Sequence, residues 1–440
     1  MASRYDEMRS YLRHLLLVTA FITSTSSFVL AQSPSASAQG REKSEETFPR
    51  FEWGDHPSLR LGRSTRIDLR LRLQLDVRGS EAPFGDDDEL NSDAVDLARR
   101  RLGIEGEILN IIDYEIEREL ATTDGWRDVY ANYKQFAAVQ VQAGKFKVPF
   151  SLDENTSATN LDFVHRSRAA EFLAPGRDVG VQVHGRVARR RLRYEAGLFR
   201  HDGSNARTND LERVYAGRTF AGRVRTAPFR LGKGVWRDLE VGVAMTSGDV
   251  PEGQPGLRGR TVFDERFYRP DVFVRGARRR LGLEGQWRPG PFSVKAELIR
   301  LTQERSGQSV EDTDLSALIG RGWYVSGTWA VTGERKADGL DNPRRPLFRG
   351  GPGAVELAVR IESLRFESEA RGTDLSTGPR ANEILGNADR AVTLGVNWYA
   401  NRWVKLQLNG IRETIRDPFQ GPLPEKPSFW STALRFQLTI

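Results

Sequence analysis

The sequence predicts an all-β protein, a transmembrane antiparallel β-barrel of about sixteen strands whose third long loop folds into the lumen. Apolar and polar residues alternate with a period of two in segments of about ten residues. Short and long connections alternate between these segments, and no stretch in the body of the chain is apolar for long enough to form a membrane-spanning helix. The 440 residues are 38% hydrophobic and 28% charged, with a mean hydropathy of −0.52, which excludes an α-helical membrane protein.

The N-terminus has the layout of a secretory signal peptide. Arg4, Arg9 and Arg13 precede an apolar segment over residues 15–30, and small residues allow cleavage after Ala31 or as late as Ala38. The alternative, a buried N-terminal helix, would need a longer amphipathic pattern and a cap. We therefore expect a signal peptide over 1–31, a polar linker over 32–65 and a barrel over 66–440. The absence of cysteine excludes disulfide scaffolds and, with the signal peptide, favours an exported bacterial protein that does not meet nucleic acid.

The clearest strand is residues 67–78, in which Ile67, Leu69 and Leu71 begin an uninterrupted alternation with Asp68, Arg70 and further polar residues. The same pattern recurs to the last residue of the chain. We expect sixteen strands, beginning near residues 66, 98, 113, 128, 139, 179, 191, 219, 239, 278, 292, 321, 354, 391, 403 and 430.

Connection lengths separate the two ends of this barrel. Short turns such as 109–112 and 400–402 alternate with long polar loops such as 79–97 and 147–178, as in outer-membrane barrels. One connection departs from this rule, because residues 332–353 should form a short turn and are long. Aromatic residues at strand ends, among them Trp398 and Tyr399, are typical of the rings at membrane interfaces.

The polar face of such strands would line a water-filled lumen. Basic residues on this face include Arg70, Arg72, Arg99, Arg101, Arg186, Arg193, Arg223 and Arg225, and acidic residues share it. The loop 147–178 combines many apolar side chains with His165, Arg166, Arg168 and Arg177. A loop folded into the lumen would bury the apolar residues on the wall and present the arginines to the pore axis, forming an anion-binding constriction. The alternative is a surface loop whose arginines pair with its own acids or with lipopolysaccharide phosphates.

The remaining chemistry is sparse. The formal charge of +7 points towards anionic partners. The five histidines show no metal-ligand spacing, and nucleophile-elbow, P-loop and dinucleotide motifs are absent from the sequence. We expect no enzyme activity, no cofactor and no metal.

The segment from Val139 to Ser151, with Gly144-Lys-Phe-Lys-Val-Pro-Phe150 within it, and its continuation to Gly185 resemble the phosphate-selective porins of the O and P type. Arg100–Gly106 and Leu394–Tyr399 also resemble that family. The resemblance implies a sixteen-stranded outer-membrane barrel, usually a homotrimer, that passes small anions, in some members phosphate or polyphosphate. The partners expected are therefore anionic solutes, outer-membrane lipid and lipopolysaccharide. Two other functions stay open: a structural or adhesive barrel with a closed lumen, and a soluble exported β-sandwich that binds an acidic polysaccharide.

Overall fold

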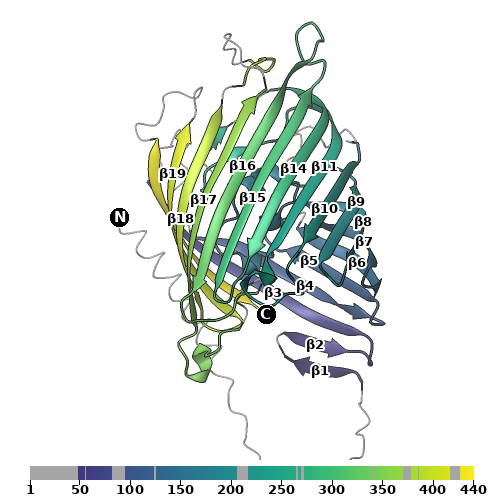
Figure 1. Cartoon of the computed structure of the whole chain (residues 1–440), viewed down its shortest axis with the longest axis vertical. Coiled ribbons are helices and arrows are strands. Elements are labelled where there is room, and N and C mark those ends of the chain that lie inside the picture. The colour runs from purple at the N-terminus through teal and green to yellow at the C-terminus, as the bar shows by residue number, and fades with distance from the viewer. Residues whose placement is uncertain are drawn as a thin grey trace, which may run out of the picture. The chain divides into compact units, whose positions relative to one another are not determined.

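The computed structural model describes residues 48–440 except 55, 82–94, 123–124, 206–216, 264–265, 269–271, 338, 341, 370–377, 385 and 417–426. Within these residues, sixteen antiparallel strands form one closed barrel (Figure 1). The expected signal peptide lies outside the described residues. The barrel strands are β3 (Arg66–Ser80), β4 (Val95–Ile108), β5 (Ile112–Glu119), β6 (Trp126–Phe136), β7 (Val139–Lys147), β8 (Arg177–Val187), β9 (Leu192–Phe199), β10 (Thr219–Thr226), β11 (Glu240–Gly253), β14 (Val274–Trp287), β15 (Phe292–Arg305), β16 (Leu315–Ala330), β17 (Ala354–Ser368), β18 (Asn387–Tyr399), β19 (Val404–Arg416) and β20 (Ser428–Thr439).

Each barrel strand pairs with the one before it, and β20 closes the barrel on β3 with Leu434 opposite Val77. All sixteen predicted strands are present, so the predicted fold class is confirmed. The alternation succeeded because one face of every strand is apolar and the other polar. The boundary that differs most is the start of β16, which begins at Leu315 rather than near 321.

A short hairpin, β1 (Arg50–Trp53) and β2 (Pro57–Arg60), precedes the barrel within the segment expected to be a linker. Strand β2 pairs with β3 through Ser58 opposite Asp68. Strand β20 pairs with β3 only from Arg72 onwards, so the first residues of β3 would otherwise present an open edge. The hairpin covers this edge, which is a common way to prevent unwanted strand pairing. The sequence did not predict it, because alternation over four residues is too short to recognise.

The barrel is polar inside and apolar outside. Outward residues such as Leu281 and Leu394 are 52% and 55% exposed, whereas the inward Asp76 and Arg435 are 0% and 2% exposed. Strands β5–β10, which we call the short wall, have 8 to 11 residues each. Strands β14–β19, which we call the tall wall, have 13 to 16. The tall wall faces the viewer in Figure 1.

Few other elements occur in the described residues. The third long loop contains α2 (Leu152–Asn155), η1 (Ala158–Asn160) and α3 (Arg168–Leu173). The short elements η2 (Val235–Asp238) and η3 (Leu347–Arg349) lie in connections, and β12 (Gly259–Arg260) pairs with β13 (Arg266–Tyr268) in the loop after β11. Among the described residues, no helix is long and apolar enough to cross a membrane.

Candidate functional site

Residues 148–176, which we call the internal loop, pack against the inside of the tall wall. Helix α3 contacts β15, β16 and β17. Glycines in β16 permit this close approach: a Cβ at Gly320 would lie 2.7 Å from Leu173 Cδ2, and one at Gly322 would lie 2.6 Å from Ala169 Cβ. Phe150 and Leu173 are completely buried in the largest apolar cluster. The prediction that this loop folds into the lumen is confirmed, and its apolar residues are what fasten it.

Side chains from the tall wall and β20 also hold the backbone of the internal loop. Lys405 Nζ donates to Leu161 O at 2.7 Å, and Arg435 Nη1 donates to Val164 O at 2.5 Å. The carboxylate of Glu297 accepts hydrogen bonds from two amides at the start of α2, at 3.0 and 3.2 Å. These contacts satisfy backbone groups that would otherwise be buried without partners. Several inward charges of the barrel therefore position the loop.

The unusually long turn 331–353 anchors the internal loop from the short-turn side. Its Lys336 is buried, and Lys336 Nζ lies 2.5 Å from both Asp162 of the loop and Glu356 of β17. Lys295 reaches Asp162 at 2.8 Å. Burial alone would raise the pKa of Asp162, but the two lysines outweigh it and hold that pKa well below its ordinary value. The connection that broke the rule of short turns thus carries a lysine into the lumen.

The predicted constriction residues are engaged within the protein. Arg166 donates to the carbonyl oxygens of Asp153 and Thr156, and Arg177 forms a forked pair with Asp128. Arg168 corrects the prediction: it is 1% exposed, because its backbone amide binds Glu362 and its guanidinium donates to Thr261 O and pairs with Glu171. Burial and several neighbouring arginines lower the pKa of His165, so this imidazole is neutral and adds no charge.

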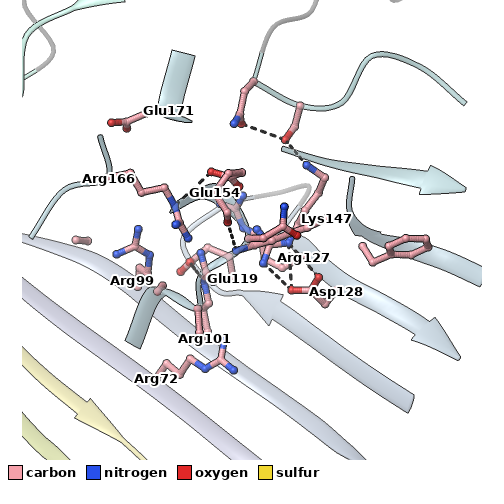
Figure 2. A pocket seen from close by; sticks show the side chains of 18 of the residues that line it. Arg72, Arg99, Arg101, Glu119, Arg127, Asp128, Lys147, Glu154, Arg166 and Glu171 are labelled. Carbon is pink, nitrogen blue, oxygen red and sulfur yellow. Dashed lines mark hydrogen bonds and ion pairs between the residues drawn. The ribbon is translucent and has the colours of Figure 1, made fainter. Parts of the chain in front are cut away.

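A cavity of about 880 Å³ (Figure 2) is lined partly by residues near the long-loop ends of the strands, such as Arg78, Asp96 and Ser204. We call it the long-loop cavity. Figure 2 shows acidic and basic side chains interleaved around it, among them Glu154 and Asp128 beside Arg166 and Arg127. Arg72, Arg99 and Arg101 line it, together with Arg166, Arg177 and His165. Its nine basic residues face eight acidic ones, so it has almost no net charge; the acids are Asp96, Glu105, Glu115, Glu119, Asp128, Glu154, Glu171 and Glu195.

A second cavity of about 500 Å³ lies towards the short turns, and we call it the short-turn cavity. It shares Asn155, Ser157 and Glu195 with the long-loop cavity, so the two adjoin beside the internal loop. Among the described residues that line it, two are acidic, Glu195 and Glu240, and nine are basic: Arg186, Arg190, Arg191, Arg193, Arg223, Arg225, Arg230, Arg288 and Lys295. The predicted lumen residue Arg70 lines a third cavity of about 320 Å³ on the same side.

Three arginines of the short-turn cavity face one another across adjacent strands. Arg186 of β8 is directly opposite Arg193 of β9, and Arg193 is directly opposite Arg225 of β10. We call these three residues the inner ladder. Like charges directly opposite each other destabilise a sheet. In the described part of the chain, no hydrogen bond or ion pair engages the guanidinium of Arg186 or Arg193, and Arg225 lies 3.6 Å from Glu195 and 3.9 Å from Glu284.

The inner ladder was only half visible in the sequence. Alternation placed each arginine on the lumen face, but it could not show that the three lie in one row. A row requires the register between strands, which depends on turn geometry. One indication of this row was available in the sequence: Arg186 and Arg193 lie on either side of the same tight turn, which brings them opposite each other.

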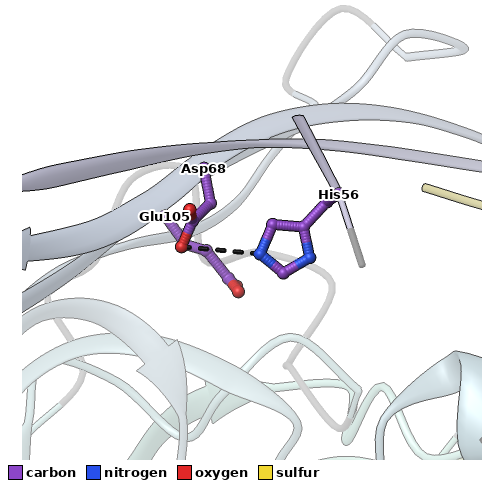
Figure 3. A group of neighbouring side chains, drawn as sticks. All are labelled: His56, Asp68 and Glu105. Atoms are coloured by element: carbon purple, nitrogen blue, oxygen red, sulfur yellow. Dashed lines mark ion pairs between the residues drawn. The ribbon is translucent and has the colours of Figure 1, made fainter. Parts of the chain in front are cut away.

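His56, Asp68 and Glu105 gather where the hairpin meets β3 (Figure 3). Their ligand atoms lie within 4.8 Å of one another, and His56 Nε2 is 3.5 Å from Asp68 Oδ2. Both carboxylates already have cationic partners: Arg66 lies 2.8 Å from Asp68, and Arg70 lies 2.5 Å from Glu105. The cluster fastens the hairpin to the barrel.

Comparisons with known proteins agree with this architecture. The family model described as phosphate-selective porin O and P matches residues 67–440. Porin O of Pseudomonas aeruginosa is 25% identical over 328 residues, which cover 67% of this chain and 70% of that protein. Among solved structures, OmpT of Vibrio cholerae has a TM-score of 0.54 at 12% identity, covering 86% of this chain and 98% of the other. The channel DcaP of Acinetobacter baumannii has a TM-score of 0.53 at 9% identity, covering 86% and 98%. At these identities, the solved structures establish the fold alone.

Proposed function

Because the chain belongs to the phosphate-selective porin O and P family, we propose that this outer-membrane channel prefers anions and that the inner ladder sets the preference. The observation that carries the proposal is the charge of the short-turn cavity, with nine basic and two acidic lining residues. The long-loop cavity, with nearly equal numbers of both signs, offers no comparable imbalance. Assembly as a homotrimer belongs to the same proposal and rests on the family resemblance.

The mechanism is electrostatic. A cavity lined by charges of one sign and bounded by low-dielectric walls raises the local concentration of the opposite ion. Directly opposed residues lie about 5 Å apart, so the three ladder arginines span roughly 10 Å. Guanidinium groups bind phosphate and carboxylate oxygens in a forked geometry and remain charged at every working pH. Small phosphates and short polyphosphates are therefore the solutes we propose.

Water access keeps such binding reversible. Arg186 is exposed and Arg193 and Arg225 are half-buried, so the ladder is hydrated rather than sealed. A selective pore must bind an ion strongly enough to admit it and weakly enough to release it. Arg166 of the internal loop and Arg177 at the start of β8 meet this need less well, because both already hold partners in the protein.

Reversal-potential measurements in a salt gradient test this proposal. Replacing Arg186, Arg193 and Arg225 together with Gln should lower the anion-to-cation permeability ratio by about tenfold, within the range that focused fields produce. The comparison variant replaces Arg166 and Arg177 with Gln and should change the ratio less. Phosphate should block chloride current in the unmodified channel and lose this block in the ladder variant.

Two outcomes would contradict the proposal. If the loop variant loses selectivity and the ladder variant keeps it, the constriction predicted from the sequence governs the pore. If the purified protein gives no conductance steps in a planar bilayer, the barrel is closed and its role is structural or adhesive.

A further inference from the structure

A row of arginines crosses the outer face of the tall wall. Each of the six consecutive strands β14–β19 carries one outward-facing arginine. Eight residues separate this arginine from an apolar or aromatic residue at the short-turn end of the same strand. In β16, for example, Arg321 lies eight residues from Trp329. We call this row the outer belt; its members are Arg279, Arg300, Arg321, Arg365, Arg390 and Arg412.

The strand register makes the outer belt continuous. Arg300 of β15 is directly opposite Arg321 of β16, which is directly opposite Arg365 of β17. On either side the row continues one diagonal step away: Arg300 faces Leu281, two residues from Arg279, and Arg390 faces Ser363, two residues from Arg365. Opposed like charges again destabilise the sheet by themselves. The acidic side chains beside these three arginines, Glu367 and Glu369, compensate their charge only in part.

The outer belt lies at the upper edge of the apolar surface. Eight residues of a strand tilted by about 40° rise roughly 20 Å, close to the roughly 25 Å apolar band of outer-membrane barrels. Below it, Leu298, Trp323 and Ile361 face outwards and are exposed. The belt is on the long-loop side, and long loops of such barrels face the cell exterior. Its guanidinium groups are therefore at the depth of outer-leaflet head groups.

The belt side chains are available to a ligand. Those of Arg300, Arg321 and Arg365 are 48%, 50% and 49% exposed. Within the described residues, these three arginines have two acidic partners on this surface. Glu367 pairs with Arg321 and Arg365 at 3.1 and 2.6 Å, and Glu369 lies 3.8 Å from Arg300.

We propose that the outer belt is a docking surface for lipopolysaccharide, with the arginines binding its lipid-linked phosphate groups. The chemistry follows from the arrangement. Phosphate accepts forked hydrogen bonds from guanidinium, and a row of arginines at head-group depth matches a lipid that carries several phosphates. Surface charge attracts anionic lipids additively, and apolar residues below the row contact the acyl chains. The belt therefore recognises the lipid beside the tall wall independently of what passes through the lumen.

Binding of purified lipopolysaccharide to the refolded protein in detergent micelles tests this proposal. Replacing Arg300, Arg321 and Arg365 together with Gln should weaken the apparent affinity about a hundredfold, since each basic residue contributes about fivefold near an anionic surface. The matched control replaces the outward Arg100, Arg118 and Arg200 with Gln, which removes equal charge outside the belt. It should retain binding within about threefold.

Two further arms identify the ligand. Lipopolysaccharide stripped of its phosphates should bind the unmodified protein as weakly as the belt variant binds intact lipid. Inorganic phosphate at millimolar concentration should not displace the lipid; displacement would mean that the belt is a site for free phosphate. Equal losses in the belt and control variants would overturn the proposal. The belt variant should keep its reversal potential, so the result is independent of the proposed anion preference.

Discussion

The inner ladder on the short wall and the outer belt on the tall wall use the same residue in the same way. Each places three arginines directly opposite one another on adjacent strands, Arg186 to Arg225 inside and Arg300 to Arg365 outside. They differ in what they face. The ladder looks into a cavity with few acids, whereas the belt looks outwards above an apolar band. Which face of the strand carries the row decides whether the anion it attracts is a solute or a lipid.

A third set of charges, unlike the two arginine rows, has a structural role. Asp162, Lys336 and Glu356 are buried and paired with one another, and they hold the internal loop in place. Removing one partner of such a group leaves an uncompensated buried charge. The arginines of the two rows are exposed or half-buried, so their loss should change binding more than folding.

The position of the outer belt at the edge of the apolar band predicts a large difference in stability between two substitutions in β18. Leu394 lies on the same outward face of β18 as Arg390, four residues closer to the short-turn end and near mid-membrane. Leu394→Arg should lower the free energy of unfolding by about 2–4 kcal/mol, because the charge must enter the apolar band. Arg390→Gln should change it by at most about 1 kcal/mol. Guanidinium-induced unfolding in lipid vesicles measures both, and equal costs would mean that the belt is not at the membrane boundary.

The sequence predicted the barrel well because its information is local. Alternation predicts every barrel strand, and the apolar residues of 147–178 predict a loop that is buried. Partners far along the chain were not predictable: Arg177 pairs with Asp128, and the backbone amide of Arg168 binds Glu362. These contacts depend on which strands become neighbours and in what register. The same limit hid both arginine rows, whose members were each visible but whose alignment was not.

Salt should separate the ladder from the loop-anchoring charges. The Debye length falls from about 10 Å at 0.1 M to about 3 Å at 1 M, so the field of the hydrated ladder should weaken within the short-turn cavity. We expect the anion-to-cation permeability ratio to fall severalfold between these concentrations while single-channel events persist. Reversal potentials at both ionic strengths provide the measurement. A ratio that does not depend on salt would indicate that selectivity arises at a buried, unscreened site such as Arg168.

The smallest expected effect concerns the shape of the cation rather than its charge. Arg321 is at the centre of the directly opposed trio in the outer belt and shares Glu367 with Arg365. Arg321→Lys keeps the positive charge but replaces a planar fork with a compact ammonium, which binds phosphate as a point charge. We expect Arg321→Lys to weaken the affinity for lipopolysaccharide about threefold, which is less than the loss expected from Arg321→Gln. Lysine keeps the charge and loses roughly half of the charge-assisted hydrogen-bonding contribution. Titration of Arg321→Lys and Arg321→Gln side by side measures the difference, with the reversal potential as the internal control. If Lys and Gln weaken binding equally, the forked geometry rather than the charge carries recognition; if Lys has no effect, the belt acts through its summed field alone.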